Sequence, residues 1–76
     1  MKAYVMINVR LGSILEVVNN LREITGVKQA NMTFGTYDVI SVIEAEDVHE
    51  IGRMIATKIQ PIPGILDTLT CLVIES

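Results

Sequence analysis

The five residues Phe34-Gly35-Thr36-Tyr37-Asp38 combine side chains and backbone freedom suited to holding a small polar ligand. Gly35 can adopt a positive φ, or let a ligand approach the main chain closely, because it lacks a Cβ. Asp38 can accept hydrogen bonds from nearby amides or receive a cationic group. Glycine and aspartate are also frequent in turns, so an ordinary turn is the alternative interpretation. We predict that this stretch is the candidate site.

Residues that could support catalysis or bind a metal are sparse elsewhere in the chain. His49 has no second histidine or cysteine at a spacing that would complete a zinc site, so we expect a solvated helix residue. Ser13 fits a helix cap and Ser41 fits a buried strand, and neither has a base visible in the sequence. The densest acidic group lies where a helix dipole favours negative charge and comprises Glu44, Glu46, Asp47 and Glu50. The sequence predicts no metal, no cofactor and no enzymatic activity.

Length and composition predict one small, self-associating domain over residues 1–76. A chain of 76 residues buries only about 60% of its unfolded surface and is marginally stable alone. Half of the residues are hydrophobic and the mean hydropathy is +0.46, which suggests that another subunit covers part of the apolar surface. The net charge of -3, with six Lys and Arg against nine Asp and Glu, argues against direct contact with nucleic acid.

The sequence contains no evident targeting or membrane segment. The apolar run that begins at Ala3 is broken by Asn8 and Arg10, so it is too short for a secretory signal or a membrane span. Cys71 has no second cysteine to pair with, and its apolar neighbours predict a buried thiol. We expect a cytoplasmic protein without membrane contact.

The hydrophobic pattern predicts a strand, a helix and a second strand in the first half of the chain. Apolar side chains occur at both odd and even positions of residues 2–10, which indicates a strand. Ser13 and Glu16 form a capping pattern, and the helix that follows ends near Gly26. Its apolar stripe consists of Ile14, Val17, Val18, Leu21 and Ile24. A β-branched and polar mixture then predicts a strand over residues 27–34.

Residues 34–38 are predicted to form a hairpin connection, which we call the central hairpin. The second half of the chain then continues with a strand, a helix and a last strand. A nearly continuous apolar run predicts a buried strand over residues 39–43. Asp47 and Glu50 repeat the capping arrangement, and the helix that follows ends before Pro61 because proline cannot continue it. Residues 65–75 alternate as a last strand with largely apolar faces.

The predicted order βαββαβ is that of the ferredoxin-like α+β fold, a four-stranded antiparallel sheet with two helices on one face. Right-handed crossovers place both helices on the same side, so the second apolar face of the sheet needs another cover. Two sheets packed face to face would supply it, as a dimeric α/β barrel-like assembly. No linker, repeat or charge block indicates a second domain.

Three segments carry a resemblance to a known family: Gly35-x-Tyr37-Asp38, the strand and helix start that follow, and Ile62-Pro63-Gly64 with the threonines beyond it. Over essentially its whole length the chain resembles the ligand-sensing (RAM) domain of Lrp/AsnC transcriptional regulators. The resemblance implies a homodimer, a higher even-numbered assembly of dimers, and a free amino acid bound near dimer contacts. The ligand-binding residues that it implies are Gly35, Thr36, Tyr37, Asp38, Thr68 and Thr70.

The chain differs from full-length members of this family at its amino terminus. Those members carry a helix-turn-helix there, whereas the first predicted strand of this chain starts at Lys2. We therefore expect a stand-alone sensing module that does not bind DNA directly and that regulates by associating with a full-length relative. On sequence alone, Thr68 and Thr70 fit ordinary strand threonines better than ligand contacts, and Tyr37 fits an aromatic residue at an interface as well as a ligand contact.

Two other functions fit the predicted topology. Small dimeric α+β barrel enzymes, such as cofactor-free monooxygenases and isomerases, use a pocket between sheet and helices. They need several convergent polar groups in that pocket, and the sequence offers only Asn8, Ser41 and Tyr4. A pure assembly domain that binds no ligand is the third interpretation.

Overall fold

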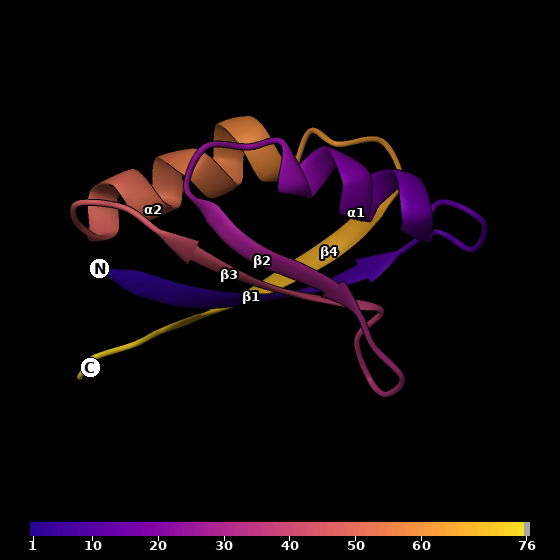
Figure 1. Cartoon of the computed structure of the whole chain (residues 1–76), viewed down its shortest axis with the longest axis horizontal. Helices are drawn as coiled ribbons and strands as arrows, with labels where there is room; N and C mark the ends of the chain where they lie inside the picture. The colour runs from indigo at the N-terminus through magenta and orange to yellow at the C-terminus, as the bar shows by residue number, and fades with distance from the viewer. Residues whose placement is uncertain (76) are drawn as a thin grey trace.

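Figure 1 shows the computed structural model of the chain, which describes residues 1–75. Its elements are β1 (Lys2–Val9), α1 (Ile14–Arg22), β2 (Val27–Met32), β3 (Val39–Glu44), α2 (Val48–Met54), the π-helical turn η1 (Ile55–Ile59) and β4 (Ile65–Leu72). The four strands form one antiparallel sheet in the order β2-β3-β1-β4. The predicted ferredoxin-like α+β fold is therefore confirmed.

Both helices lie on one face of the sheet, as Figure 1 shows, and the hydrophobic core fills the layer between the helices and the sheet. Alternate residues of β1 and β3 point into this layer because successive side chains of a strand face opposite ways. The buried apolar residues are Ala3, Val5, Ile7, Val9, Val17, Val18, Leu21, Ala30, Val39, Ile43, Ile51, Ile55, Ile59 and Ile62. The part of the chain that the structure describes has this one core, which fixes the position of every element.

The opposite side of the sheet, which we call the open face, is also largely apolar. Residues that pair directly across neighbouring strands have their side chains on the same face of the sheet, so the strand pairing identifies the residues of the open face. They are Tyr4, Met6 and Asn8 of β1, Ile40 and Val42 of β3, and Asp67, Leu69 and Cys71 of β4. Tyr4 and Leu69 are 41% and 48% exposed, so the apolar centre of this face is open to solvent in a single subunit.

The first helix is shorter than predicted and has no side-chain cap. It ends at Arg22, and a turn leads to Gly26, whose φ of 100° confirms a left-handed residue before β2. Ser13 makes no capping hydrogen bond, so the predicted cap is wrong. Its φ of -107° and ψ of 2° lie outside the extended region that a capping serine needs, and its side chain packs against Gly64 instead.

The second helix begins as predicted and ends in an unusual turn. The Asp47 carboxylate accepts a hydrogen bond from the Glu50 amide at 2.9 Å, which confirms the predicted cap. The chain then widens into η1, where the Gln60 amide donates to the Ile55 carbonyl at 2.8 Å, just before Pro61 ends the helix. Within residues 1–75, no helix is long and apolar enough to cross a membrane.

The last strand is more exposed than its sequence predicts. β4 forms an edge of the sheet and ends at Leu72, and most of its side chains are open to solvent on both faces. Cys71 is exposed, so the predicted buried thiol is wrong for a single subunit. The apolar neighbours of Cys71 reflect an apolar edge strand, and the core lies under β1 and β3 instead.

Two glycines with positive φ allow a matched test of how β4 is joined to the core. A Cβ at Gly64 would lie 2.7 Å from the Ser13 Cβ, whereas a Cβ at Gly12 would meet no atom within 4 Å. Gly64→Ala and Gly12→Ala share the backbone cost of a positive φ, which is about 1–3 kcal/mol. We expect Gly64→Ala to lower the free energy of unfolding by a further ~1–3 kcal/mol because of overpacking, measured by urea denaturation. Equal losses in the two variants would contradict this packing.

Candidate functional site

Asp38 joins the central hairpin to β1 through hydrogen bonds. Its Oδ2 accepts a hydrogen bond from the Val9 amide at 2.8 Å, and its own amide donates to the Ile7 carbonyl at 3.0 Å. Val9 directs its amide towards β3, but β3 begins only at Val39, one residue after Asp38. The aspartate side chain therefore supplies the acceptor that the neighbouring strand lacks. Its Oδ1 accepts no hydrogen bond within residues 1–75 and is available to a ligand.

Thr33 closes the base of the same hairpin. Its amide donates to the Asp38 carbonyl at 3.0 Å, and its hydroxyl donates to the Tyr37 carbonyl at 2.7 Å. These bonds hold residues 33–38 as one loop and leave the amides of Gly35 and Thr36 without an acceptor in the described chain. Free amides at a fixed loop are suited to binding an anionic group.

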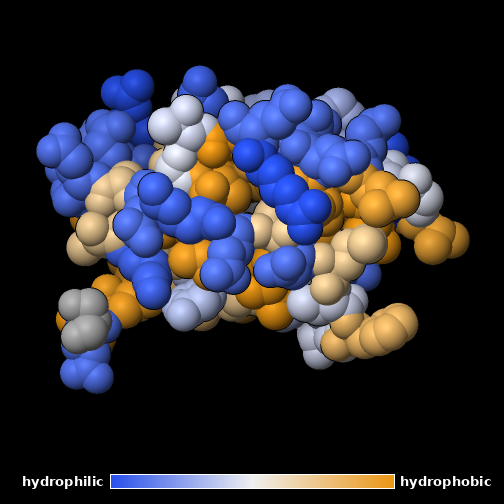
Figure 2. Space-filling view, viewed as in Figure 1, coloured by the Kyte–Doolittle hydropathy of each residue, from blue (hydrophilic) through white to orange (hydrophobic). Residues whose placement is uncertain are grey.

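The tip of the hairpin projects into solvent. Gly35 has a φ of 145°, and a Cβ placed on it would meet no atom within 4 Å, so another molecule can approach its main chain. Phe34 is fully exposed, whereas Tyr37 and Asp38 are half-buried. In Figure 2, apolar side chains gather at the end of the molecule from which the hairpin extends in Figure 1. A single exposed apolar side chain is common on protein surfaces, so the evidence for a site here is the accessible main chain of the hairpin.

The two predicted threonines lie apart from this hairpin. Thr68 and Thr70 pair with Ile7 and Val5 of β1, so their side chains lie on the helix side of β4. The hairpin continues from β3, on the other side of β1, and two strand spacings correspond to about 10 Å. The Thr68 hydroxyl also accepts a hydrogen bond from Gln60 Nε2 at 3.3 Å. One subunit thus brings together residues 35–38 but does not add the threonines to them.

Polar contacts near this end of the sheet include one pair that the sequence did not predict. The Asn8 side-chain Nδ2 donates to Asp67 Oδ2 at 3.3 Å on the open face. Asn8 stands out as the only polar residue inside an apolar strand, and that was the available signal. Its partner is 59 residues away in the sequence, so no local pattern could have identified Asp67.

Of the polar residues that the structure describes, Ser41 alone is buried in the layer between sheet and helices. Tyr4 and Asn8 face the open side of the sheet. Ser41 is fully buried, and its hydroxyl donates to the Val5 carbonyl at 3.2 Å. No group of three or more His, Cys, Asp or Glu side chains in residues 1–75 lies together as a metal site, and His49 is exposed as predicted.

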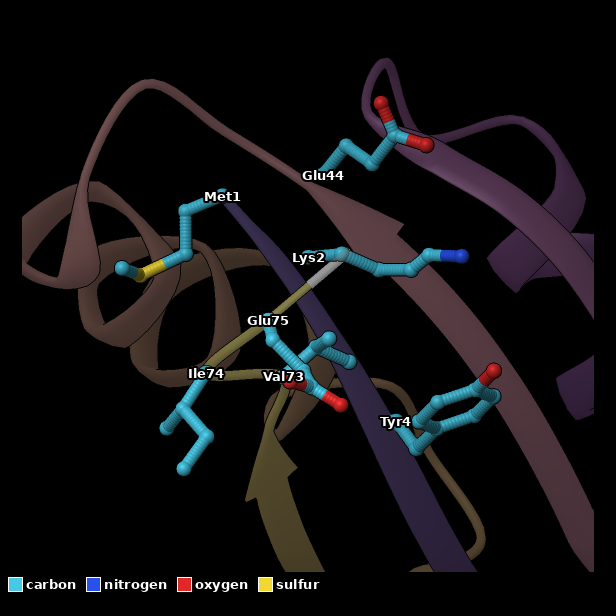
Figure 3. Close-up of a pocket in the computed structure, with 7 residues that line it drawn as sticks. All are labelled: Met1, Lys2, Tyr4, Glu44, Val73, Ile74 and Glu75. Carbon is cyan, nitrogen blue, oxygen red and sulfur yellow. The ribbon is translucent and has the colours of Figure 1, made fainter.

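A wide hollow lies at the other end of β1, between Met1 and residues 73–75. Figure 3 shows its lining, which consists of Met1, Lys2, Tyr4, Glu44, Val73, Ile74 and Glu75. Its volume is about 640 Å³, but it is widely open to solvent. The Lys2 ammonium lies 5.9 Å from the centre of the Tyr4 ring. None of the predicted site residues lines this hollow, so the hairpin remains the candidate site.

The sheet order, the exposed apolar sheet face and the fixed, exposed hairpin define a small ferredoxin-like α+β domain. Comparison with protein families identifies the family to which this domain belongs. The chain belongs to the Lrp/AsnC family, because the model described as "Lrp/AsnC ligand binding domain" matches residues 2–76. The resemblance predicted from the sequence is confirmed.

Two longer proteins of different kinds each contain a segment similar to this chain. The chain is 31% identical over 55 residues to PH1916, an HTH-type transcriptional regulator of Pyrococcus horikoshii, and the match covers 72% of this chain and 37% of the regulator. It is 36% identical over 59 residues to a homocitrate synthase of Sulfurisphaera tokodaii, with 78% of this chain and 13% of that enzyme covered. The chain thus spans well under half the length of these relatives.

Solved structures share the fold along almost the whole chain. The structure of PHS023 from Pyrococcus horikoshii superposes with a TM-score of 0.91 at 28% identity, covering 99% of this chain and 90% of that one. The complex of the transcriptional regulator NMB0573 from Neisseria meningitidis with L-Met has a TM-score of 0.87 at 14% identity. It covers 97% of this chain and 49% of that protein, and at this identity it shows the fold alone.

The bond between Asp38 and Val9 predicts a structural effect of changing the aspartate. In Asp38→Ala, the buried Val9 amide loses its acceptor, and the free energy of unfolding should fall by about 1–3 kcal/mol. Asp38→Asn retains a carbonyl oxygen in the same place and should lose less. Urea denaturation of both variants measures this difference, and an Asp38→Ala protein as stable as the wild type would show that Asp38 does not fasten the hairpin.

Proposed function

We propose that this chain is an effector-binding, oligomeric regulatory module that senses a free amino acid and has no catalytic activity of its own. The observation that carries the proposal is the hairpin of residues 33–38, which the Asp38 bond to Val9 fixes while its tip remains exposed. Membership of the Lrp/AsnC ligand-binding family supports the class of function. The complex of NMB0573 with L-Met supports the class of ligand.

The hairpin offers groups complementary to both charges of an amino acid. The ligand carboxylate needs donors, which the free amides of Gly35 and Thr36 can provide. The ligand ammonium needs acceptors, which Asp38 Oδ1 and the loop carbonyls can provide through charge-assisted bonds. Tyr37 lies beside these groups and is half-buried, so its ring can cover part of the ligand.

Thr68 and Thr70 complete the proposed site from a second subunit. They lie on the helix side of β4, apart from the hairpin of their own chain. A hydroxyl can donate to a carboxylate or accept from an ammonium, so either threonine suits an amino acid held by the hairpin of another subunit. In this arrangement ligand binding depends on the assembly.

The subunits form homodimers through the open face, and dimers associate further in even numbers. The exposed Tyr4 and Leu69 and the half-buried Met6, Ile40 and Val42 give this face an apolar centre that a second sheet can bury. Packing of two sheets in this way gives the dimeric α/β barrel-like assembly expected from the family.

The module acts in the cytoplasm on other proteins. It does not contact nucleic acid directly, since a net charge of -3 disfavours binding to a phosphate backbone. A full-length regulator of the same family is the proposed partner, because such a regulator carries a domain of the same fold with which this chain can assemble.

The amino acid site can be tested with a charge-removing variant and a matched control. A thermal-shift screen against the twenty amino acids identifies the ligand, because a specific ligand stabilises the folded state. Asp38→Asn should then weaken its binding by roughly ten- to a hundred-fold in calorimetry, through loss of a charge-assisted bond. The control Asp47→Asn keeps its helix cap and lies away from the hairpin, so it should bind as the wild type does.

Two results would overturn the proposed site. One is unchanged affinity in an Asp38→Asn protein that assembles normally, since the carboxylate would then have no part in binding. The other is a screen in which no amino acid raises the melting temperature even at millimolar concentration.

The open-face dimer predicts a specific effect on assembly. Ile40→Lys places a charge at the centre of the apolar patch and should at least halve the mass of the assembly. Leu15→Lys changes an exposed residue of α1 in the same way and should leave the mass unchanged. Sedimentation velocity at micromolar concentration measures both. A wild-type protein that remains a folded monomer, or an Ile40→Lys protein of full mass, would contradict the proposed interface.

A further inference from the structure

The two free edges of the sheet differ in how they are protected. At the β2 edge, Arg22 Nε and Nη2 donate to the Ala30 carbonyl at 3.1 Å and 2.8 Å, which occupies an outward-facing acceptor. A register shift between Val27 and Gln29 also bends this strand, and Lys28 adds a charge. Blocked carbonyls, irregular register and lysine are devices that prevent an edge strand from pairing with another chain.

The β4 edge has no blocked carbonyl and no lysine, and its one register shift lies at its start, between Ile65 and Asp67, before residues 68–72. It has eight residues, contains no proline, and carries one charged side chain, that of Asp67. Leu66, Leu69 and Leu72 are 63%, 48% and 42% exposed. A long, apolar and unblocked edge strand readily pairs with another strand.

The hydrogen bonds of β4 show which of its groups are free. The Val73 amide donates to the Lys2 carbonyl at 2.9 Å, so Val73 directs its main-chain groups towards β1. Main-chain groups alternate in direction along an antiparallel strand. The amides and carbonyls of Thr68, Thr70 and Leu72 therefore point away from β1, into solvent.

We propose that β4 pairs antiparallel with β4 of a second copy of this chain, about a two-fold axis at Leu69. This register places Thr68 opposite the partner's Thr70, as a pair whose main-chain groups both point outward. Such a pair exchanges two N–H···O bonds, and the symmetry supplies it twice. The result is one continuous sheet across two subunits, and the interface is distinct from the open face.

The side chains in this register are self-complementary. Threonine lies opposite threonine, which is a favourable cross-strand pair. Leu66 lies opposite the partner's Leu72, and Leu69 opposite the partner's Leu69, so apolar residues meet each other. Asp67 lies opposite the partner's Cys71, so the only charge of the strand does not meet its own copy. A second copy of this chain therefore fits this edge.

Disulfide trapping tests the register directly. In a Cys71→Ser background, subunits carrying Thr68→Cys are mixed with subunits carrying Thr70→Cys and are mildly oxidised. Cα atoms of a hydrogen-bonded pair lie about 5.5 Å apart, which suits a disulfide. The mixture should give covalent dimers as its main product, whereas either variant alone should give only background amounts. Both side chains lie on the helix side of the sheet, so an open-face dimer cannot produce this bond.

The trapping experiment has two outcomes that would overturn the proposal. If the mixture cross-links no more than the single variants, the strands do not pair in this register. If the single variants cross-link as well as the mixture does, the contact is a random collision. Neither result bears on amino acid binding, which calorimetry measures separately.

Proline variants at the two edges give an independent measurement. Thr70→Pro removes an outward amide and keeps the bonds of β4 to β1, so the subunit should fold, as circular dichroism can verify. It should weaken association at this edge by about tenfold or more. Met32→Pro makes the same change at an exposed position of the β2 edge and should have no effect. Identical sedimentation of both variants and the wild type would overturn the pairing of β4.

Discussion

The two crossovers of the chain place both helices on the same face of a four-stranded sheet, and the other properties of the molecule follow from this constraint. One layer of helices can bury one face, so the core lies on that side and the second apolar face is left open. Within residues 1–75, no helix or strand packs on that second face. In the proposed dimer, the open face of a second copy covers it.

The fold could be predicted from the sequence because its periodicities are local. The alternation of Val5, Ile7 and Val9 and the helical stripe through Val17 and Leu21 each fix one element. Exposure and capping could not be predicted in the same way, since they depend on distant residues. Ser13 fails as a cap because Gly64 packs against it, and Cys71 is exposed because β4 is an edge strand. The apolar residues of β4 predicted a buried strand, but in the single subunit most of them lie at the surface.

The candidate site shows the same division between local and distant information. The hairpin was visible in the sequence because Gly35 and Asp38 have turn chemistry between two apolar runs. The bond from Val9 to Asp38 joins residues 29 positions apart, and no spacing rule predicts it. The position of Thr68 on the helix side also depends on the pairing of β4 with β1. The sequence therefore predicts the loop, whereas the structure shows what holds it.

Val9 is the residue at which the hairpin, β1 and β4 meet. Its amide donates to Asp38, and it pairs with Ile65 at the point where the register of β1 and β4 shifts. The next amide along, that of Arg10, donates to the Gly64 carbonyl at 2.7 Å and so fixes the start of β4. The Val9 amide occupies Oδ2 of Asp38, so the bond that fixes the hairpin leaves Oδ1 of the same carboxylate without a hydrogen bond in residues 1–75. Three consecutive contacts thus join the hairpin to the start of the edge strand: Val9 to Asp38, Val9 to Ile65, and Arg10 to Gly64.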